Sequence, residues 1–368
     1  MRASTDTTIP ARKKYGYLLF LLPPALPVLA VQLASRLGHW NLFAFLVPAV
    51  VFGLIPVVDF LIGKDAHNPD ATEEVQLRAD RFYTTLLVLC LPVQLACVGY
   101  GAYVVTHAPL SMLGKLGWTL SIGLVSGVIA INTGHELIHR RSRALQAVGG
   151  LLLSTVGYAS FKVEHVLGHH VHVATPKDNS TAREGETVYA FAVRALARNI
   201  PHAFALERAA AQRKGLPHGL LSSELARYYA LTFAFFVGAL VAFGPAGGAF
   251  FLGQGLIAIL LLEIVNYVEH YGLSRRVIND RGAYEVTTPL HSWNSNYFVT
   301  NLLLFQLQRH SDHHANAARP YQVLRHMEGS PQLPAGYATM VVVALCPPLF
   351  HVLMSRKLRD HRLAHASS

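Results

Sequence analysis

The sequence predicts an all-α integral membrane protein, with six transmembrane helices and a cytoplasmic helical cap that carries a histidine-rich site. Three observations support this fold class. Hydrophobic residues make up 52% of the 368 residues and charged residues only 14%, whereas soluble domains usually carry about 25% charged residues. Six apolar stretches of about 20 residues are each long enough to cross a bilayer as a helix. Lys and Arg are distributed unevenly among the segments between these stretches, which is typical of membrane proteins with a fixed orientation.

The first four spans are expected in the N-terminal third of the chain. Residues 15–35 follow a basic tail and could be a cleaved signal, but the apolar run is about 20 residues long and has no convincing cleavage site. We therefore expect an uncleaved first span, kinked by its prolines. Further apolar stretches predict spans at 41–63, 83–106 and 115–134.

Two more spans are expected at 229–247 and 249–269. The basic tail before the first span and the segment after the fourth hold an excess of Lys and Arg, whereas the turn at 107–114 carries no charge. Under the positive-inside rule, both chain ends are cytoplasmic. The predicted cytoplasmic segments are 64–82, 140–228 and 270–368. No linker, low-complexity tract or repeat divides the chain, so residues 1–368 are expected to form one domain.

Histidines gather in four motifs: HELIH (135–139), EHVLGHH (164–170), NYVEHYGL (266–273) and LQRHSDHHA (307–315). The predicted topology, derived without them, places all four on the cytoplasmic side. Spacings of three and four residues let one helix face offer two imidazoles to one metal ion. The motifs hold nine candidate histidines, more than the roughly six ligands that one ion accepts, which indicates two metal ions. Imidazole ligands suit iron, zinc and copper. The candidate ligands are His135, His139, His165, His169, His170, His270, His310, His313 and His314.

Each motif also contains an acid next to a histidine. On a helix, such neighbours point about 100° apart. We therefore expect the acids to accept a hydrogen bond from a ligand's second N–H rather than to bind metal directly. These acids are Glu136, Glu164, Glu269 and Asp312.

Other classes of protein fit less well. HELIH matches the HExxH pattern of zinc proteases, with Glu136 as the base, but a protease would leave most of the histidines unexplained. A metal transporter should place its ligands near the bilayer midplane, whereas these lie at span ends and in cytoplasmic segments. The net charge of +10 does not form a basic stripe with interleaved aromatic residues, so no nucleic-acid partner is expected. Cys90, Cys97 and Cys346 lie in apolar stretches without zinc or disulfide spacing and are expected in the core.

The four motifs resemble those of the membrane-bound alkane 1-monooxygenases, a family of non-haem di-iron enzymes also called alkane hydroxylases. The similarity runs from the second span to about residue 340 and includes NTGHE (132–136), VATPKD (173–178), HSWNSN (291–296) and NLLLFQLQRHSDHHA (301–315). Membrane fatty-acid desaturases share the HxxxH and HxxHH patterns. The HYG sequence within NYVEHYGL is more specific, because it is typical of alkane hydroxylases and their xylene-monooxygenase relatives.

The resemblance implies that the nine histidines hold two iron ions. It also implies that His291, where relatives often have two histidines in a row, supports the ligands or the local structure. The implied reaction is terminal hydroxylation of medium- to long-chain linear alkanes by O2, with electrons from rubredoxin, which a reductase reduces with NAD(P)H. The chain has neither a dinucleotide-binding glycine fingerprint nor CxxC pairs, so it would have to borrow electrons. A xylene-type aromatic methyl monooxygenase and a membrane fatty-acid desaturase remain alternatives.

The family also suggests a location and a substrate route. We expect a multi-pass protein of the bacterial inner membrane, because alkanes dissolve in the bilayer and can enter the site from lipid. The spans should then form an apolar channel. Some relatives carry tryptophan near Val51, and valine there predicts a longer channel that accepts longer alkanes.

Overall fold

The computed structural model describes residues 11–365, so the start of the basic N-terminal tail lies outside the described residues. Within this range the chain is helical, and the only β-type pairs are three isolated bridges. Four helical segments are long and apolar enough to cross a membrane: Lys13–Leu37, Arg81–His107, Met112–Ile138 and Glu224–His270. These segments confirm a helical membrane protein.

Several of these segments combine successive elements. The first consists of α1 (Ala11–Gly16), η1 (Tyr17–Leu21) and α2 (Leu22–Leu37), and the second is α7 (Arg81–His107). The third joins α8 (Met112–Ser126), the π-helix η3 (Gly127–Asn132) and α9 (Thr133–Ile138). The stretch predicted as the second span is divided into α3 (Trp40–Phe43), α4 (Leu46–Ala49), the π-helix η2 (Val50–Leu54) and α5 (Ile55–Ile62). Its continuous apolar part, Leu46–Ile62, is shorter than the other candidates.

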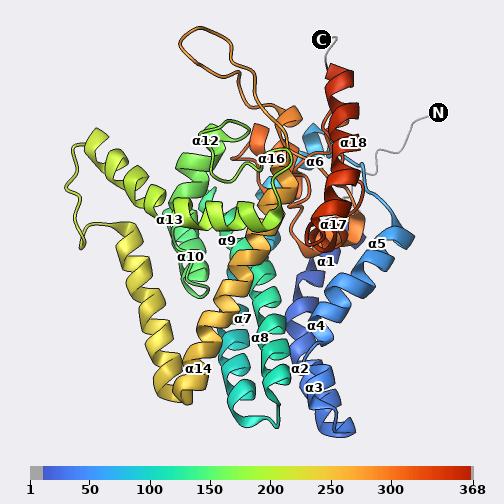
Figure 1. The fold of residues 1–368 in the computed structure, drawn as a ribbon, viewed down its shortest axis with the longest axis vertical. Helices are drawn as coiled ribbons and strands as arrows, with labels where there is room; N and C mark the ends of the chain where they lie inside the picture. The colour runs from blue at the N-terminus through green and yellow to red at the C-terminus, as the bar shows by residue number, and fades with distance from the viewer. Residues whose placement is uncertain (1–10, 366–368) are drawn as a thin grey trace.

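The last two predicted spans form a single element that folds back on itself. Helix α14 (Glu224–His270) leaves the helical conformation at Gly244, where φ is 68°, and Pro245 follows. Glycine adopts this left-handed conformation without strain, and proline has no N–H to lose at the start of a new helix. The two arms of α14 therefore form a V (Figure 1).

The remaining helices are shorter and build the cap. Several of them, including α12, α16, α17 and α18, gather at the upper end of the long helices (Figure 1). Their bounds are α6 Ala71–Ala79, α10 Arg143–Ser154, α11 Phe161–Val163, η4 Glu164–His169, α12 His170–His172, α13 Val188–Arg213, η5 Pro289–His291, α15 Phe298–Leu303, α16 His310–Ala315, η6 Tyr321–Val323, α17 Tyr337–Ala344 and α18 Pro347–His365.

Apolar side chains lie on the outer surface as well as in the core. Phe60 on α5 is 79% exposed and Val241 on α14 is 80% exposed, as expected for faces that contact lipid. Inside, Tyr267 and Tyr271 at the end of α14 pack against Phe350 of α18. Cys346, predicted to be buried, is exposed because it lies in the short turn between α17 and α18.

Candidate metal centre

The structure brings the nine candidate histidines together in two groups that could each hold a metal ion. Within each group the potential ligand atoms lie within 4.8 Å of one another. The first group, called the five-histidine group below, contains His135, His139, His165, His170 and His313. The second, the four-histidine group, contains His169, His270, His310 and His314. His172, which follows the second motif, belongs to neither.

The ring nitrogens of each group face one another. In the four-histidine group, the Nε2 of His310 lies 2.9 Å from that of His314 and 3.2 Å from that of His270. In the five-histidine group, the Nε2 atoms of His135 and His313 are 3.0 Å apart. Such convergence of Nε2 atoms on common points is the arrangement that imidazole ligands adopt around a cation.

The protonation state of these rings also suits a cation. Burial, together with neighbouring histidines, lowers the pKa of His139 to about 3 and holds the pKa of His165 and His313 well below the usual value. Neutral imidazoles each keep one nitrogen lone pair for a metal. Moreover, the Nε2 of His139 is buried without a hydrogen-bond partner among the described residues. The residues present therefore fit a pair of metal ions.

Two π-helical turns place these ligands. The turn η3 directly precedes the helix that carries His135, and η4 contains His165 and His169. A π turn has one extra residue, and such turns often occur at functional sites. In a regular α-helix, the i, i+4 spacing would let His165 and His169 face one metal ion. The wider turn instead pairs His165 with His170, at an Nε2–Nε2 distance of 3.0 Å, and leaves His169 for the other group.

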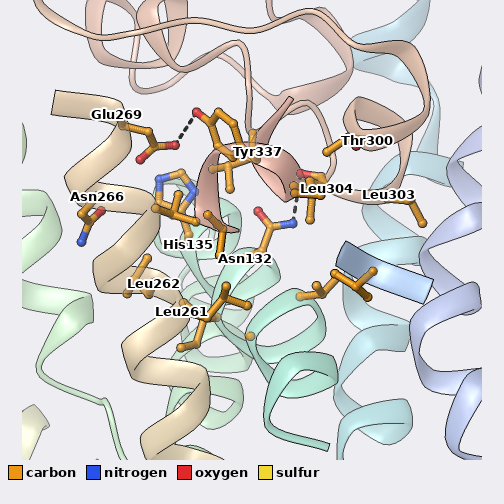
Figure 2. A pocket seen from close by; sticks show the side chains of 18 of the residues that line it. Asn132, His135, Leu261, Leu262, Asn266, Glu269, Thr300, Leu303, Leu304 and Tyr337 are labelled. Carbon is orange, nitrogen blue, oxygen red and sulfur yellow. Dashed lines mark hydrogen bonds between the residues drawn. The ribbon is translucent and has the colours of Figure 1, made fainter. Parts of the chain in front are cut away.

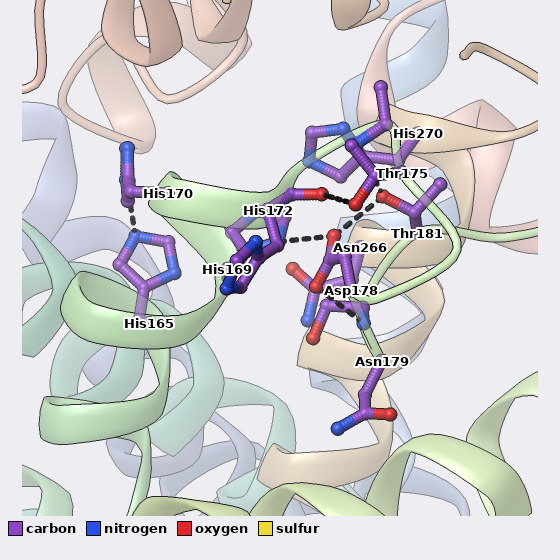
Figure 3. A network of polar contacts seen from close by, with 12 residues as sticks. His165, His169, His170, His172, Thr175, Asp178, Asn179, Thr181, Asn266 and His270 are labelled. Atoms are coloured by element: carbon purple, nitrogen blue, oxygen red, sulfur yellow. Dashed lines mark hydrogen bonds and ion pairs between the residues drawn. The ribbon is translucent and has the colours of Figure 1, made fainter. Parts of the chain in front are cut away.

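Asp178 supports the four-histidine group, and the sequence analysis did not single it out. Its Oδ2 lies 2.9 Å from the Nδ1 of His169, and both side chains are buried (Figure 3). Burial alone would raise the pKa of Asp178, but His169 and the donors Thr181 and Ser180 lower it below its usual value. The carboxylate therefore holds the His169 proton on Nδ1, which leaves Nε2 free to face the group.

Glu269 lies on the inner side of the ligands rather than behind them. Its Oε2 is 3.2 Å from the Nε2 of His310, the nitrogen that faces the other histidines. Its Oε1 accepts a 2.6 Å hydrogen bond from the Tyr337 hydroxyl. The prediction that Glu269 accepts from a ligand's outer N–H is therefore wrong. The carboxylate instead borders the four-histidine group directly.

The other three predicted acids have partners elsewhere in the cap. Because each follows or precedes its histidine on a helix, its side chain points toward a neighbouring segment. Glu136 contacts Arg140 and the backbone N–H of Tyr321, Glu164 contacts His202, and Asp312 contacts Asn316, Arg319 and the backbone N–H of Arg325. For Glu136, Glu164 and Asp312, the expected bond to a ligand's second N–H is therefore replaced by contacts that fix the cap.

His291 has a structural role. Its Nδ1 accepts from the backbone N–H of Thr288, and its Nε2 lies 3.2 Å from Glu285, so the ring caps the short helix η5. The Nδ1 of His270 lies 3.5 Å from the hydroxyl of Ser292, the residue after His291. The hydrogen bonds of the His291 ring therefore hold the local structure rather than a candidate ligand.

An apolar cavity of about 100 Å³ leads to the two groups. Val51, Leu261 and Leu303 are among the apolar residues that line it, and His135 and His310 lie in its wall (Figure 2). These two histidines come from different groups. The cavity therefore ends where the two groups approach each other.

Comparisons with known proteins agree with this architecture. A family model described as "Fatty acid desaturase" matches residues 110–344. The chain is 48% identical to alkane 1-monooxygenase 2 of Pseudomonas aeruginosa, over 95% of this chain and 93% of that protein. It is 49% identical to alkane 1-monooxygenase 1 of the same species, over 97% and 94%. The hydroxylase component of Pseudomonas putida xylene/toluene monooxygenase is 28% identical, over 88% and 84%. The chain therefore belongs to the alkane 1-monooxygenase family and is a membrane monooxygenase of the oxidoreductase class.

Proposed function

We propose that the protein hydroxylates the terminal carbon of medium- to long-chain linear alkanes at two iron ions held by the nine histidines. The observation that carries this proposal is the cavity in Figure 2, whose exposed surface is mostly apolar and which reaches His135. His310 also lines this cavity. An alkane has no polar group to anchor, so such a cavity fits it. The names of the relatives that share about half of the sequence support the same substrate class.

The membrane arrangement is part of the proposal. Six spans result if Leu46–Ile62 and both arms of α14 cross the bilayer together with the three other long segments. Both chain ends and the histidine groups would then lie on the cytoplasmic side of the bacterial inner membrane. The excess of Lys and Arg in the predicted cytoplasmic segments supports this orientation.

The residues around the site have separable tasks. Bound iron would supply the activation of O2, so that one oxygen atom enters a C–H bond and the other leaves as water, with two electrons and two protons consumed. Asp178 keeps the Nε2 of His169 deprotonated and directed inward. The apolar wall, which includes Val51 and Leu261, excludes water and aligns the chain so that its end meets the histidines.

Rubredoxin, reduced by its reductase and NAD(P)H, is the proposed electron donor. The chain carries no motif for a flavin, nicotinamide or iron–sulfur group, so electrons must come from a partner. The net charge of +10 favours a small acidic redox protein by electrostatic steering. Reduction should therefore slow as ionic strength rises, and a rate independent of salt would contradict this docking mode.

Product analysis tests the function. Membranes that contain the protein receive rubredoxin, its reductase, NADH and 18O2, with a mixture of linear alkanes, xylene and a fatty acyl substrate. We expect labelled 1-alkanols, and their loss in His313→Ala. Labelled benzylic alcohol alone would assign the protein to the aromatic branch, to which the 28% identical relative belongs by name. An unlabelled unsaturated acyl product would assign it to the desaturases.

A further inference from the structure

We propose that the cavity contains a binding position for the hydroxyl group of a primary alcohol, with the Oδ1 of Asn132 as the hydrogen-bond acceptor. Linear alkan-1-ols should therefore bind in preference to equally long chains that have no O–H. The inference rests on the proposed function in one respect, because a 1-alkanol would be the product. The binding itself depends only on the geometry around Asn132.

The orientation of the Asn132 amide is fixed. Its Nδ2 donates a 3.0 Å hydrogen bond to the backbone carbonyl of Leu304. A carbonyl oxygen can only accept, so the amide nitrogen must lie on that side and Oδ1 on the other. Figure 2 shows the oxygen turned away from Leu304, toward the side where His135 and Tyr337 lie.

This oxygen belongs to the cavity and has no partner. Asn132 lines the cavity, and the bond from Nδ2 to Leu304 is the only hydrogen bond that its side chain makes among the described residues. It also lines a smaller cavity that borders His135 and His313. This acceptor therefore stands at the histidine end of a largely apolar space.

Most other polar groups in the wall already have partners. The Thr300 hydroxyl donates to Asp59. Glu269 accepts from Tyr337 and faces His310. The Nδ2 of Asn266 donates to the Glu263 carboxylate at 3.4 Å. Its Oδ1, like that of Asn132, makes no hydrogen bond among the described residues, so the Asn266→Leu variant below tests this second acceptor.

An acceptor without a donor in apolar surroundings is unfavourable, and a ligand that supplies a donor recovers that free energy. An alkane has no donor, whereas the hydroxyl of an alkan-1-ol has one. One neutral hydrogen bond of this kind corresponds to an affinity difference of roughly two- to tenfold. The alcohol would lie with its oxygen beside His135 and its chain along the apolar wall.

The test compares two ligands of equal size that differ only in the donor. The protein in lipid nanodiscs is equilibrated by dialysis against empty nanodiscs, which corrects for partition into lipid, with an isotopically labelled alkan-1-ol or a methyl ether with the same number of heavy atoms. No turnover is needed. The variants are Asn132→Leu, which has a similar size and no acceptor, and Asn132→Ala, which only leaves space. Asn266→Leu removes the other amide of the cavity wall and is the matched control.

We expect the wild type and Asn266→Leu to bind the alcohol about two- to tenfold more tightly than the ether, and both Asn132 variants to bind the two ligands equally. If Asn132 has a purely structural role, its variants should bind both ligands more weakly and keep the ratio of the two affinities. That result would overturn the proposal. Equal affinity of the wild type for the alcohol and the ether would also overturn it, whether or not the variants fold. So would a loss of the alcohol preference in Asn266→Leu alone.

The 18O2 product assay is read separately. If 1-alkanols form but the alcohol preference is absent, the inference fails and the proposed function stands. If the preference depends on Asn132 but no alkane is hydroxylated, the proposed function fails and the alcohol site stands.

Discussion

Asp178→Asn should weaken metal binding at the four-histidine group. Asp178 accepts the His169 Nδ1 proton and the Thr181 hydroxyl at Oδ2, and the Ser180 backbone N–H at Oδ1. Asparagine has a single oxygen, so its NH2 group must face at least one of these donors. His169 then loses a charge-assisted hydrogen bond of about 1.5–3 kcal/mol, or it changes tautomer and turns a protonated Nε2 toward the other ligands.

Losses of such supporting partners reduce metal affinity or activity by about 10- to 100-fold. We expect a loss of this size in iron affinity, measured by competition with a graded series of chelators followed by elemental analysis. Only the fraction of iron held by the four-histidine group should be lost.

The matched control is Glu136→Gln. Glu136 is also a buried acid next to a ligand histidine, but it contacts Arg140 and Tyr321 rather than an imidazole. The Glu136→Gln variant should therefore keep an iron affinity within a fewfold of that of the wild type. The reasoning is refuted if Asp178→Asn retains wild-type affinity at both groups, or if the two variants lose iron equally.

Three further substitutions test the cavity and the cap. Val51→Trp adds bulk to the cavity wall and should shift the products toward shorter 1-alkanols, as measured by gas chromatography; an unchanged chain-length profile would contradict the assigned role. Gly127→Ala would place a methyl group 2.8 Å from a terminal carbon of Leu261, which must turn and shorten the cavity, so the same assay should again show shorter products. Asp65→Asn should lower stability at neutral pH by about 1–3 kcal/mol, because Asp65 bonds Lys13. Burial alone would raise the pKa of Asp65, but Lys13 and its other partners hold it below the usual 3.8. The stabilisation is therefore present above pH 3.8 and lost as the pH falls through the lower folded-state value. Thermal unfolding in detergent should show that the stabilities of the wild type and Asp65→Asn become equal only in that acidic range. A stability difference that stays constant with pH would exclude this ion pair as its cause.

The gathering of the nine histidines could be predicted from the sequence because its signal is local. Spacings such as that of His135 and His139 place two rings on one side of a helix, and the structure gathers these residues. The division of ligands between the groups could not be predicted, since it depends on the π turn η4, which pairs His165 with His170. An i, i+4 rule assumes a regular α-helix.

The supporting residues were less predictable because their contacts are not local. Asp178 lies in a loop nine positions after His169, with no helical register to connect them. The signal that could have found it was its place in VATPKD, one of the stretches similar to the family. Glu269 was identified, but its contact with His310 comes from a distant part of the chain. Neighbouring positions on α14 alone could not reveal which side of the ligands it occupies.

The apolar helical stretches could be predicted from composition, but the breaks in their backbone could not. The stretches 229–247 and 249–269 were placed correctly as helical, but the break at Gly244 falls inside the first stretch, three residues before its predicted end. The second predicted span proved to be interrupted before Leu46. Hydropathy reports where a chain is apolar, but it does not report where its hydrogen-bond pattern changes.

The most direct test of the account is the number of iron ions per chain in the reconstituted protein, measured for the wild type and for one ligand variant of each group. The account predicts two in the wild type, with one strongly bound iron remaining in His270→Ala and one in the double variant His139→Ala/His165→Ala; two histidines must be removed from the five-histidine group because one loss would leave four, as many as the other group has. Mössbauer spectra should show that the remaining iron differs between the two variants. A single iron in the wild type, or the same remaining iron in both variants, would contradict the assignment of the nine histidines to two metal sites.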